Sequence, residues 1–291
     1  MDLPCFPQFA PLDLSFKEAL HPSLSQIPDG VSEYTFSNLF LFRRRYLYQV
    51  SIIPDCTVII TGEYEGKKFF MTPYAVPERD ALMELFRANH NWKCIPETVY
   101  ESRRDDLEKW GVEINEDRDN FDYLYLRTDL AELSGKKYHK KRNHVNAFLA
   151  EYPNHREERM TLERMPDALK ALDRWHEDKG AEGDYGPARE ALEFFGALPL
   201  EGFLYYVDDE PVGWCLGESL AGGRMFAIHF EKGIDAYRGI YQYINQSFAA
   251  SLPEGYSLLN WEQDLGDEGL RQSKMTYRPT GFVRKYVGKL P

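Results

Sequence analysis

Hydrophobic and polar residues alternate most regularly over the last third of the chain. Three strand-like stretches separated by short polar or glycine-rich turns are predicted at 202–207, 212–218 and 224–231. Apolar residues then recur at every fourth position, which predicts a long helix carrying Ile240, Ile244, Phe248 and Leu252. The predicted order ends with a strand at 257–262, a helix at 267–277 and a strand at 281–287.

The first half of the chain predicts a similar succession. Thr35 is placed to cap a helix that carries Phe36, Leu39 and Phe42. Further strands are predicted at 46–53, 57–62, 68–72, 95–99, 112–114 and 121–126, and helices at 78–89 and 102–110. A basic helix (137–151), a strand (156–162) and helices beginning at Pro166 and Pro187 link this half to the last third.

Both halves therefore contain an antiparallel meander followed by crossovers. This order predicts an α/β chain with mixed sheets and two related units, at 1–150 and 151–291.

Composition and charge exclude several classes of protein. The 291 residues are 43% hydrophobic with a net charge of −12, which excludes a disordered chain and makes broad nucleic-acid or DNA binding improbable. No apolar run reaches the roughly 18–20 residues of a membrane helix, and the N-terminus lacks a signal-peptide pattern. The four cysteines have no metal-ligand or disulfide-framework spacing, so we expect a cytoplasmic protein without a metal site.

Several segments resemble a known family. They are VDDEPVGWCLGE (207–218), AIHFEKG (227–233), YRGIYQYINQSFA (237–249), NWEQDLGDEGLRQSKMTYRP (260–279) and GKKYHKKRNHVNAF (135–148). The chain resembles uncharacterised bacterial proteins related to the C-terminal domain of phosphatidylglycerol lysyltransferases, which have a tandem GNAT acyltransferase fold.

The resemblance implies two tandem GNAT-like domains, with the active cleft in the C-terminal domain and a degenerate N-terminal copy. It also implies aminoacyl transfer from aminoacyl-tRNA to a lipid headgroup, while relatives of this architecture use acyl-CoA or modify peptidoglycan precursors. The lysyltransferases usually carry a transmembrane region. This sequence shows none, which weakens the case for a lipid acceptor.

The resemblance places a donor phosphate site where the long helix begins. A helix N-terminus offers unpaired N–H groups to an anion, and Gly233, Arg238 and Gly239 lie in the matching stretch. The acetyl-CoA motif requires Arg or Gln three residues before its first glycine and a small residue two residues after it. If Gly239 is that glycine, Ala236 and Tyr241 depart from the motif, and ordinary turn chemistry is the other interpretation.

Polar residues on two neighbouring strands are candidates for the reaction. Strand alternation places His229 and Glu231 on one face, with Glu231 as general base and His229 in the cleft. The same argument pairs Asn260 with Glu262 for substrate binding. The other interpretation is a core histidine and a surface carboxylate at a strand end.

The helix at 267–277 adds two candidates. Lys274 and Tyr277 share a stripe with Leu270, so Lys274 must find a partner, reach solvent or face a cleft. We expect Lys274 beside Glu231 and Glu262, where it contacts an acidic group or the ligand. The resemblance implies that Tyr277 donates a proton to the leaving group.

The basic helix supplies the remaining candidates. Lys137, Lys140 and Lys141 are expected to bind the phosphates of the donor, and a solvated helix face is the other interpretation.

Taken with the resemblance, these residues predict direct acyl or aminoacyl transfer from aminoacyl-tRNA or acyl-CoA to an amine or hydroxyl, without a tightly bound cofactor. The alternative is a non-catalytic binding protein for an amino acid, peptide or acyl-CoA.

Overall fold

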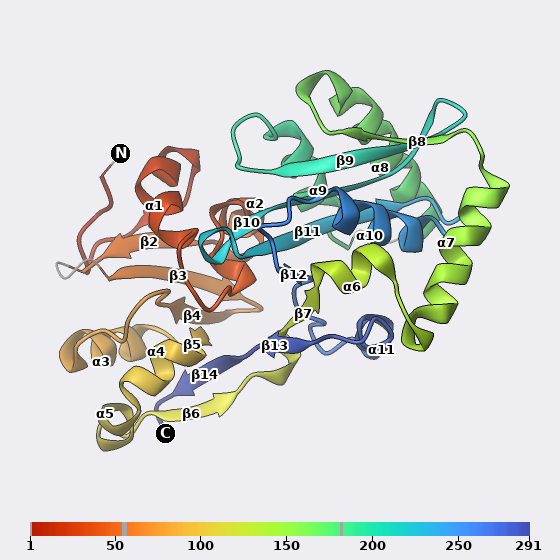
Figure 1. Cartoon of the computed structure of the whole chain (residues 1–291). Coiled ribbons are helices and arrows are strands. Elements are labelled where there is room, and N and C mark those ends of the chain that lie inside the picture. Colours follow the sequence, from red (N-terminus) through yellow and green to blue (C-terminus); the bar gives the residue numbers. More distant parts are fainter. Residues whose placement is uncertain (1, 54–56, 181–182) are drawn as a thin grey trace.

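Two seven-stranded sheets organise the chain in a computed structural model that describes residues 2–53, 57–180 and 183–291 (Figure 1). The first sheet has the order β1 (Ala10–Pro11), β2 (Gln49–Ile52), β3 (Val58–Tyr64), β4 (Lys67–Met71), β5 (Asn91–Pro96), β14 (Lys285–Lys289) and β6 (Glu113–Glu116). The second has the order β13 (Gly281–Val283), β7 (Asp122–Leu126), β12 (Leu258–Asn260), β11 (Met225–Gly233), β10 (Glu210–Leu220), β9 (Glu201–Val207) and β8 (His155–Arg159).

Each sheet contains one parallel pair of strands, β4–β5 in the first and β11–β12 in the second, among antiparallel neighbours. The predicted α/β class with mixed sheets is confirmed.

The helices form layers around and between the sheets. They are α1 (Lys17–Leu24), α2 (Phe36–Tyr46), α3 (Arg79–Ala88), α4 (Glu97–Ser102), α5 (Arg104–Lys109), α6 (Arg127–Glu132), α7 (His139–Glu151), α8 (Met165–Lys179), α9 (Tyr185–Glu193), α10 (Ile240–Ser251) and α11 (Glu268–Met275). Short 3-10 turns occur at Leu14–Phe16, Ser32–Tyr34, Arg118–Asn120, Lys136–Tyr138, Leu162–Arg164 and Ala221–Gly223.

Three hydrophobic clusters show which helices cover which sheet faces. Helices α1, α2, α8 and α9 contribute to one cluster that contacts both sheets. Helices α6, α7 and α10 cover the other face of the second sheet, and α3, α4 and α5 cover the other face of the first. The core is therefore continuous between the sheets through α1, α2, α8 and α9.

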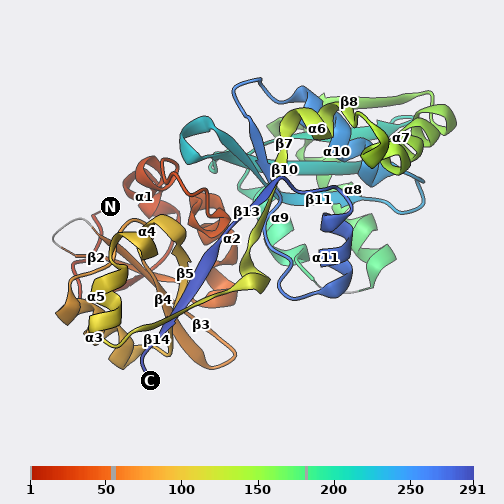
Figure 2. The same ribbon diagram turned by 60° about the horizontal axis from the view of Figure 1, so that its bottom comes forward.

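The two sheets exchange strands across the predicted division at residue 150. Strand β7, from the first half, lies in the second sheet, and β14, near the C-terminus, lies in the first. The single strand predicted at 281–287 is consequently two strands, β13 and β14, which run from one sheet to the other (Figure 2). The sheets are thus not separated at residue 150, and the domain division itself stays a prediction.

Candidate functional site

An irregularity in β11 decides where its polar side chains point. Strand β10 pairs with Phe230 and then directly with Ile228, so His229 is the extra residue of a β-bulge. His229 and Phe230 point toward α2, whereas Glu231 points toward α10. The prediction that His229 and Glu231 share a face is therefore wrong, because it assumed an unbroken period of two.

Glu231 is partly buried near the end of β11. Its Oε1 atom accepts a hydrogen bond of 2.9 Å from Asn245 Nδ2 on α10. Burial raises the pKa of Glu231 to about 8, although the Asn245 hydrogen bond and the positive charges of Lys232, Lys274 and Lys141 oppose the shift. A carboxyl group with this pKa exchanges its proton near neutral pH, as a general base must.

Lys274 of α11 turns its ammonium group inward. Its Nζ atom donates to the carbonyl oxygens of Trp261, Glu262 and Gln263 at 2.5, 3.2 and 2.7 Å. Burial lowers the pKa of Lys274 to about 8, against the attraction of nearby carboxylates, of which Glu262 contributes most. Backbone carbonyl oxygens after β12 therefore hold the Lys274 ammonium group. The sequence had suggested contact with an acidic side chain instead.

Tyr277 lies just after α11 and is buried. It contacts Lys141, another predicted site residue, and the aromatic ring of Trp261. The Lys141 ammonium lies 3.6 Å from the centre of its ring, and the Trp261 ring meets it edge-on at 4.9 Å. Burial, and next the charge of Glu231, raise the pKa of the Tyr277 hydroxyl. Burial lowers the pKa of Lys141 to about 8, and Glu231 opposes this shift. Glu231, Lys141, Lys274 and Tyr277 thus form one group, here called the Glu231 cluster.

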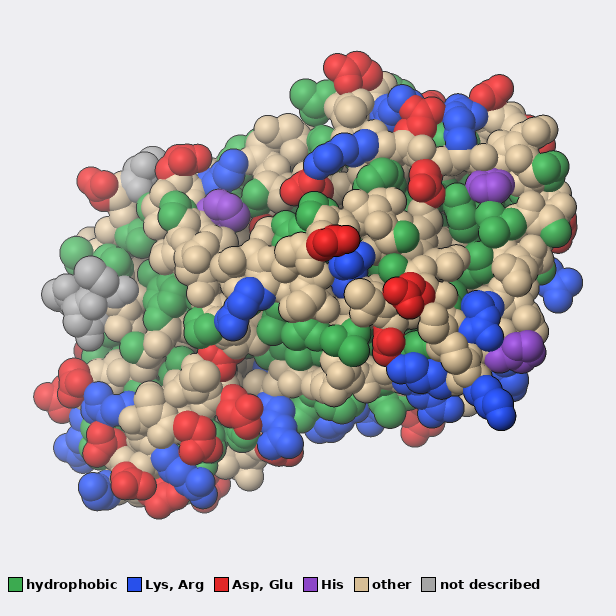
Figure 3. Space-filling model, in the orientation of Figure 1, with side chains coloured by type: hydrophobic (Ala, Val, Ile, Leu, Met, Phe, Trp, Pro, Cys, Tyr) green, Lys and Arg blue, Asp and Glu red, His purple; other side chains and the backbone are tan. Residues whose placement is uncertain are grey.

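The three lysines predicted to bind phosphate separate in the structure. Lys141 belongs to the Glu231 cluster. Lys137 and Lys140 are both exposed, and Lys137 donates a hydrogen bond of 2.6 Å to Asp129. Lys, Arg and His side chains gather on the surface where Figure 1 draws the start of α7 and α11 (Figure 3). Phosphate binding by Lys137, Lys140 and Lys141 stays a prediction.

Packing at the start of α10 explains why residue 239 is a glycine. Gly239 has a φ of 89°, and a Cβ atom there would lie 2.5 Å from the carbonyl oxygen of His144 on α7. Gly233 is buried against Ile240, and Arg238 is exposed. Turn geometry and the close approach of α7 therefore account for Gly239, while phosphate binding by these three residues stays a prediction.

His229 takes part in a different group from Glu231. Its Nδ1 and Nε2 atoms lie 2.7 Å from Glu262 Oε1 and 3.0 Å from Glu218 Oε1. Burial opposes the charge of the ring, but the hydrogen bonds to both carboxylates outweigh it and raise the pKa of His229 to about 10. Glu262 consequently does not face Glu231 as a second carboxylate of one cleft.

Asn260 has structural partners on both sides. Its Nδ2 group donates to the Gly30 carbonyl oxygen and to Asp122 Oδ2 at 2.9 and 3.0 Å, and its Oδ1 accepts from the Glu262 N–H at 2.7 Å. Its side chain is fully buried. These contacts describe a residue that shapes the backbone after β12, and its predicted substrate contact stays a prediction.

Sequence reasoning missed a buried ion triad between the sheets. Lys285 of β14 donates to Glu33 and, at 2.6 Å, to Asp122 of β7. The attraction of the two carboxylates outweighs burial and raises the pKa of Lys285. Charged residues inside two otherwise apolar strand patterns, FDYLYL and FVRKYV, were the available signal.

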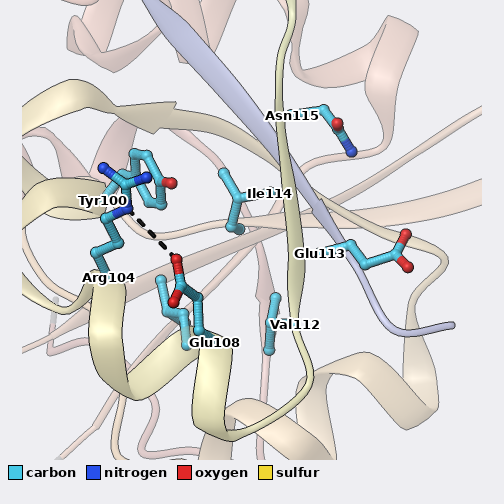
Figure 4. Close-up of a pocket in the computed structure, with 8 residues that line it drawn as sticks. Tyr100, Arg104, Glu108, Val112, Glu113, Ile114 and Asn115 are labelled. Atoms are coloured by element: carbon cyan, nitrogen blue, oxygen red, sulfur yellow. Dashed lines mark hydrogen bonds and ion pairs between the residues drawn. The ribbon is translucent and has the colours of Figure 1, made fainter.

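The hollows described on the surface lie away from these groups. A hollow of about 310 Å³ beside the first sheet is lined by Tyr100, Arg104 and Glu108 among others, and Arg104 Nε lies 3.4 Å from Glu108 Oε1. Figure 4 shows these side chains around it. None of its lining residues belongs to the Glu231 cluster. Within the described ranges, no group of His, Cys, Asp and Glu is arranged to hold a metal ion, and Cys56 lies outside those ranges.

Comparison with known proteins gives the family. The model of the family "Phosphatidylglycerol lysyltransferase, C-terminal" matches residues 24–288. The chain belongs to this family. The predicted family resemblance is thereby confirmed for nearly the whole chain, and the Glu231 cluster and His229 both lie inside the matched part.

Individual relatives agree with this assignment. The uncharacterized protein MYCGA3080 of Mycoplasmoides gallisepticum is 31% identical over 193 residues, which span 62% of this chain and only 60% of that protein. A conserved protein of unknown function from Bacteroides thetaiotaomicron has a similar structure, with a TM-score of 0.86, 28% identity and complete coverage of both chains. The structure of L-PGS from Bacillus licheniformis matches with a TM-score of 0.63 and 13% identity, over 99% of this chain and 94% of that one.

The fold of the family is therefore present over the whole chain. In the part of the chain that the structure describes, no helix combines the length and the apolar character needed to cross a membrane.

Proposed function

We propose that this chain is a transferase that passes an acyl or aminoacyl group from a carrier to an amine or hydroxyl acceptor, with Glu231 as general base. The observation that carries the proposal is the position of Glu231, a partly buried carboxyl group with an amide partner, whose pKa responds to the charges of Lys141 and Lys274. Membership of a family named for lysyl transfer to phosphatidylglycerol supports a transferase.

In the proposed step, the acceptor N–H or O–H gives its proton to Glu231 while its nitrogen or oxygen attacks the acyl carbon. A C–N or C–O bond forms, and the ester or thioester bond to the carrier breaks. Tyr277 gives a proton to the departing carrier atom and regains one from Glu231 or solvent after release. Because burial raises the pKa of Tyr277, the phenol holds its proton until the leaving group needs it. The Lys141 ammonium over the ring stabilises the phenolate as it forms.

Aminoacyl-tRNA is the donor we propose, and acyl-CoA is an outcome of the test. The helix start that would bind a pyrophosphate lacks the acetyl-CoA motif, and α7 approaches it closely. The exposed Lys140 of α7 and Lys137 of the turn before it offer a site for a tRNA backbone instead. Replacing Lys137 and Lys140 with glutamine should weaken tRNA binding and reduce the slope of its log–log salt dependence by up to about two.

The central experiment compares the wild-type chain with Glu231→Gln. Lysyl-tRNA, alanyl-tRNA and acetyl-CoA serve as donors, and phosphatidylglycerol vesicles and a small primary amine serve as acceptors. We expect kcat to fall by about 10²–10⁴-fold in Glu231→Gln with donor binding unchanged. The wild-type rate should rise with pH toward about 8, because the base must lose its proton first, and fall above it, because Lys141 then loses the charge that stabilises the phenolate. Glu254→Gln, an exposed carboxylate after α10, is the control.

Two results would contradict the proposal. The first is a Glu231→Gln variant that transfers as fast as the wild type. The second is saturable donor binding by the wild type without transfer to any acceptor, which would favour the binding-protein alternative. If the wild type transfers from acetyl-CoA but from neither aminoacyl-tRNA, the donor is acyl-CoA, and the proposal for Glu231 as general base still holds.

A further inference from the structure

The His229 ring joins two carboxylates that cannot both be served by a neutral imidazole. Both ring nitrogens lie within hydrogen-bond distance of a glutamate oxygen, at 2.7 Å for Glu262 and 3.0 Å for Glu218. An ionised carboxylate only accepts hydrogen bonds, whereas a neutral imidazole has a single N–H. The ring therefore carries both protons and a positive charge, and its side chain is only 1% exposed.

Glu262, one of these partners, lies in a strained backbone position. Its φ is 53°, in the left-handed region that a glutamate rarely adopts. Its carboxylate also accepts from Asn38 Nδ2 at 3.2 Å, and its N–H donates to Asn260 Oδ1 at 2.7 Å. Strain of this kind persists only where surrounding contacts hold it. His229, Asn38 and Asn260 are the side-chain contacts that do so, and the Tyr123 N–H adds a backbone hydrogen bond of 3.1 Å to the Glu262 carbonyl oxygen.

The same short segment makes contacts with the proposed reaction site. The carbonyl oxygens of Trp261, Glu262 and Gln263 are the three acceptors of the Lys274 ammonium. The charge of Lys274 in turn acts on Glu231. A single strained segment thus lies between the charged histidine on one side and the lysine of the Glu231 cluster on the other.

We propose that His229 is a positioning residue: through Glu262 it fixes the carbonyl oxygens of residues 261–263, which hold the ammonium group of Lys274, a member of the Glu231 cluster. This inference rests on the proposed function, because it assigns His229 a part in preparing that site. It replaces the catalytic contact expected from the sequence, since the bulge turns the ring toward α2 and away from Glu231.

Two substitutions of His229 separate this role from a general loss of charge. Asparagine places its amide near the position of Nδ1 and keeps a donor for Glu262, whereas glutamine places its amide near Nε2 and keeps a donor for Glu218. Both variants remove the same charge from the same buried site. Only His229→Gln loses the contact that the proposal requires.

The main readout does not depend on activity. The folded proteins are acetylated with N-hydroxysuccinimide acetate, and peptide mass spectrometry gives the rate at Lys274 relative to the exposed Lys140. We expect His229→Gln and Glu262→Ala to raise this ratio by about tenfold, equivalent to about 1.4 kcal/mol of lost local protection. His229→Asn and Glu262→Gln, which keep the contact, should change it by less than about threefold.

A control addresses destabilisation alone. Leu107→Ala removes a buried apolar side chain from α5, on the other face of the first sheet, and it should leave the Lys274 ratio unchanged. Equal Lys274 ratios in His229→Asn and His229→Gln, or an unchanged ratio in His229→Gln, would overturn the proposal. If a transfer reaction is found, His229→Gln should lower kcat with little change in the donor KM. If none is found, the acetylation result still decides the positioning role, so the two proposals fail separately.

Discussion

Replacing Lys285 with methionine should destabilise the fold more than any surface substitution on the same strand. The ammonium group of Lys285 is completely buried between Glu33 and Asp122, and it connects β14 of the first sheet with β7 of the second. Methionine keeps most of the bulk of the side chain and removes its charge. The variant therefore leaves two buried carboxylates facing each other without the cation between them.

The expected loss of stability in Lys285→Met depends on the hydrogen bonds that Asp122 and Glu33 retain. Removing one partner of a buried ion pair typically costs about 3–5 kcal/mol. Asp122 retains hydrogen bonds from the Ser32 N–H, the Ser32 hydroxyl and Asn260, so part of its charge stays stabilised. Glu33 retains only a 3.3 Å contact with the Ser32 hydroxyl among the side-chain contacts described. We therefore expect a loss of about 3 kcal/mol, a large part of the roughly 5–15 kcal/mol that stabilises a typical fold.

Urea unfolding at pH 7, followed by circular dichroism and tryptophan fluorescence, measures this loss. Lys289→Met, on the same strand but exposed, should stay within about 0.5 kcal/mol of the wild type. Adding Glu33→Gln to Lys285→Met removes one of the opposed charges and should recover part of the stability. The reasoning is refuted if Lys285→Met costs no more than Lys289→Met, or if Glu33→Gln gives no recovery in that background.

Two further predictions concern stability. Gly239→Ala should cost at least about 1 kcal/mol in urea unfolding, because its φ is positive and a Cβ would press on the His144 carbonyl oxygen; an equal effect of Gly255→Ala, where the space is open, would contradict this. Glu231→Gln should stabilise the fold at pH 8 by on the order of 3 kcal/mol and much less at pH 5. The folded carboxyl keeps its proton up to about pH 8 whereas the unfolded one loses it near 4.5, so wild-type stability falls across this interval. A pH-independent difference from the control Glu254→Gln would contradict it.

The elements that depend on helical periodicity were predictable from the sequence. The apolar spacing from Ile240 placed α10, and Thr35 caps α2 by accepting the Asn38 N–H at 3.1 Å, as its position before the apolar stripe predicted. Lys274, Tyr277 and Glu231 were chosen for the same cleft. The charge of Lys274 affects the pKa of Glu231, and Glu231 affects that of Tyr277, while the shared cleft stays a prediction.

The residues that were misplaced depend on breaks in regularity. One extra residue in β11 sends His229 and Glu231 to opposite faces, and no alternation pattern contains that information. Gly217, where a Cβ would lie 1.8 Å from the Ala227 carbonyl oxygen, was the signal beside it. The exchange of β7 and β14 between the sheets was also hidden, because pairing partners are set by contacts distant in the sequence.

The first half of the chain has a more direct connection with the site than a degenerate copy requires. At the start of α2, Thr35 contacts His229 of β11, and Asn38 donates a hydrogen bond to Glu262, which follows β12. The Glu262 segment in turn holds Lys274, and Ser32 reaches Gln263 next to it. Because these contacts are buried and polar, a shift of α2 by a fraction of an ångström breaks several of them together. Packing of α2 between the sheets is therefore a condition for the geometry around Glu231, and substitutions in its buried face should alter the site before they unfold the chain.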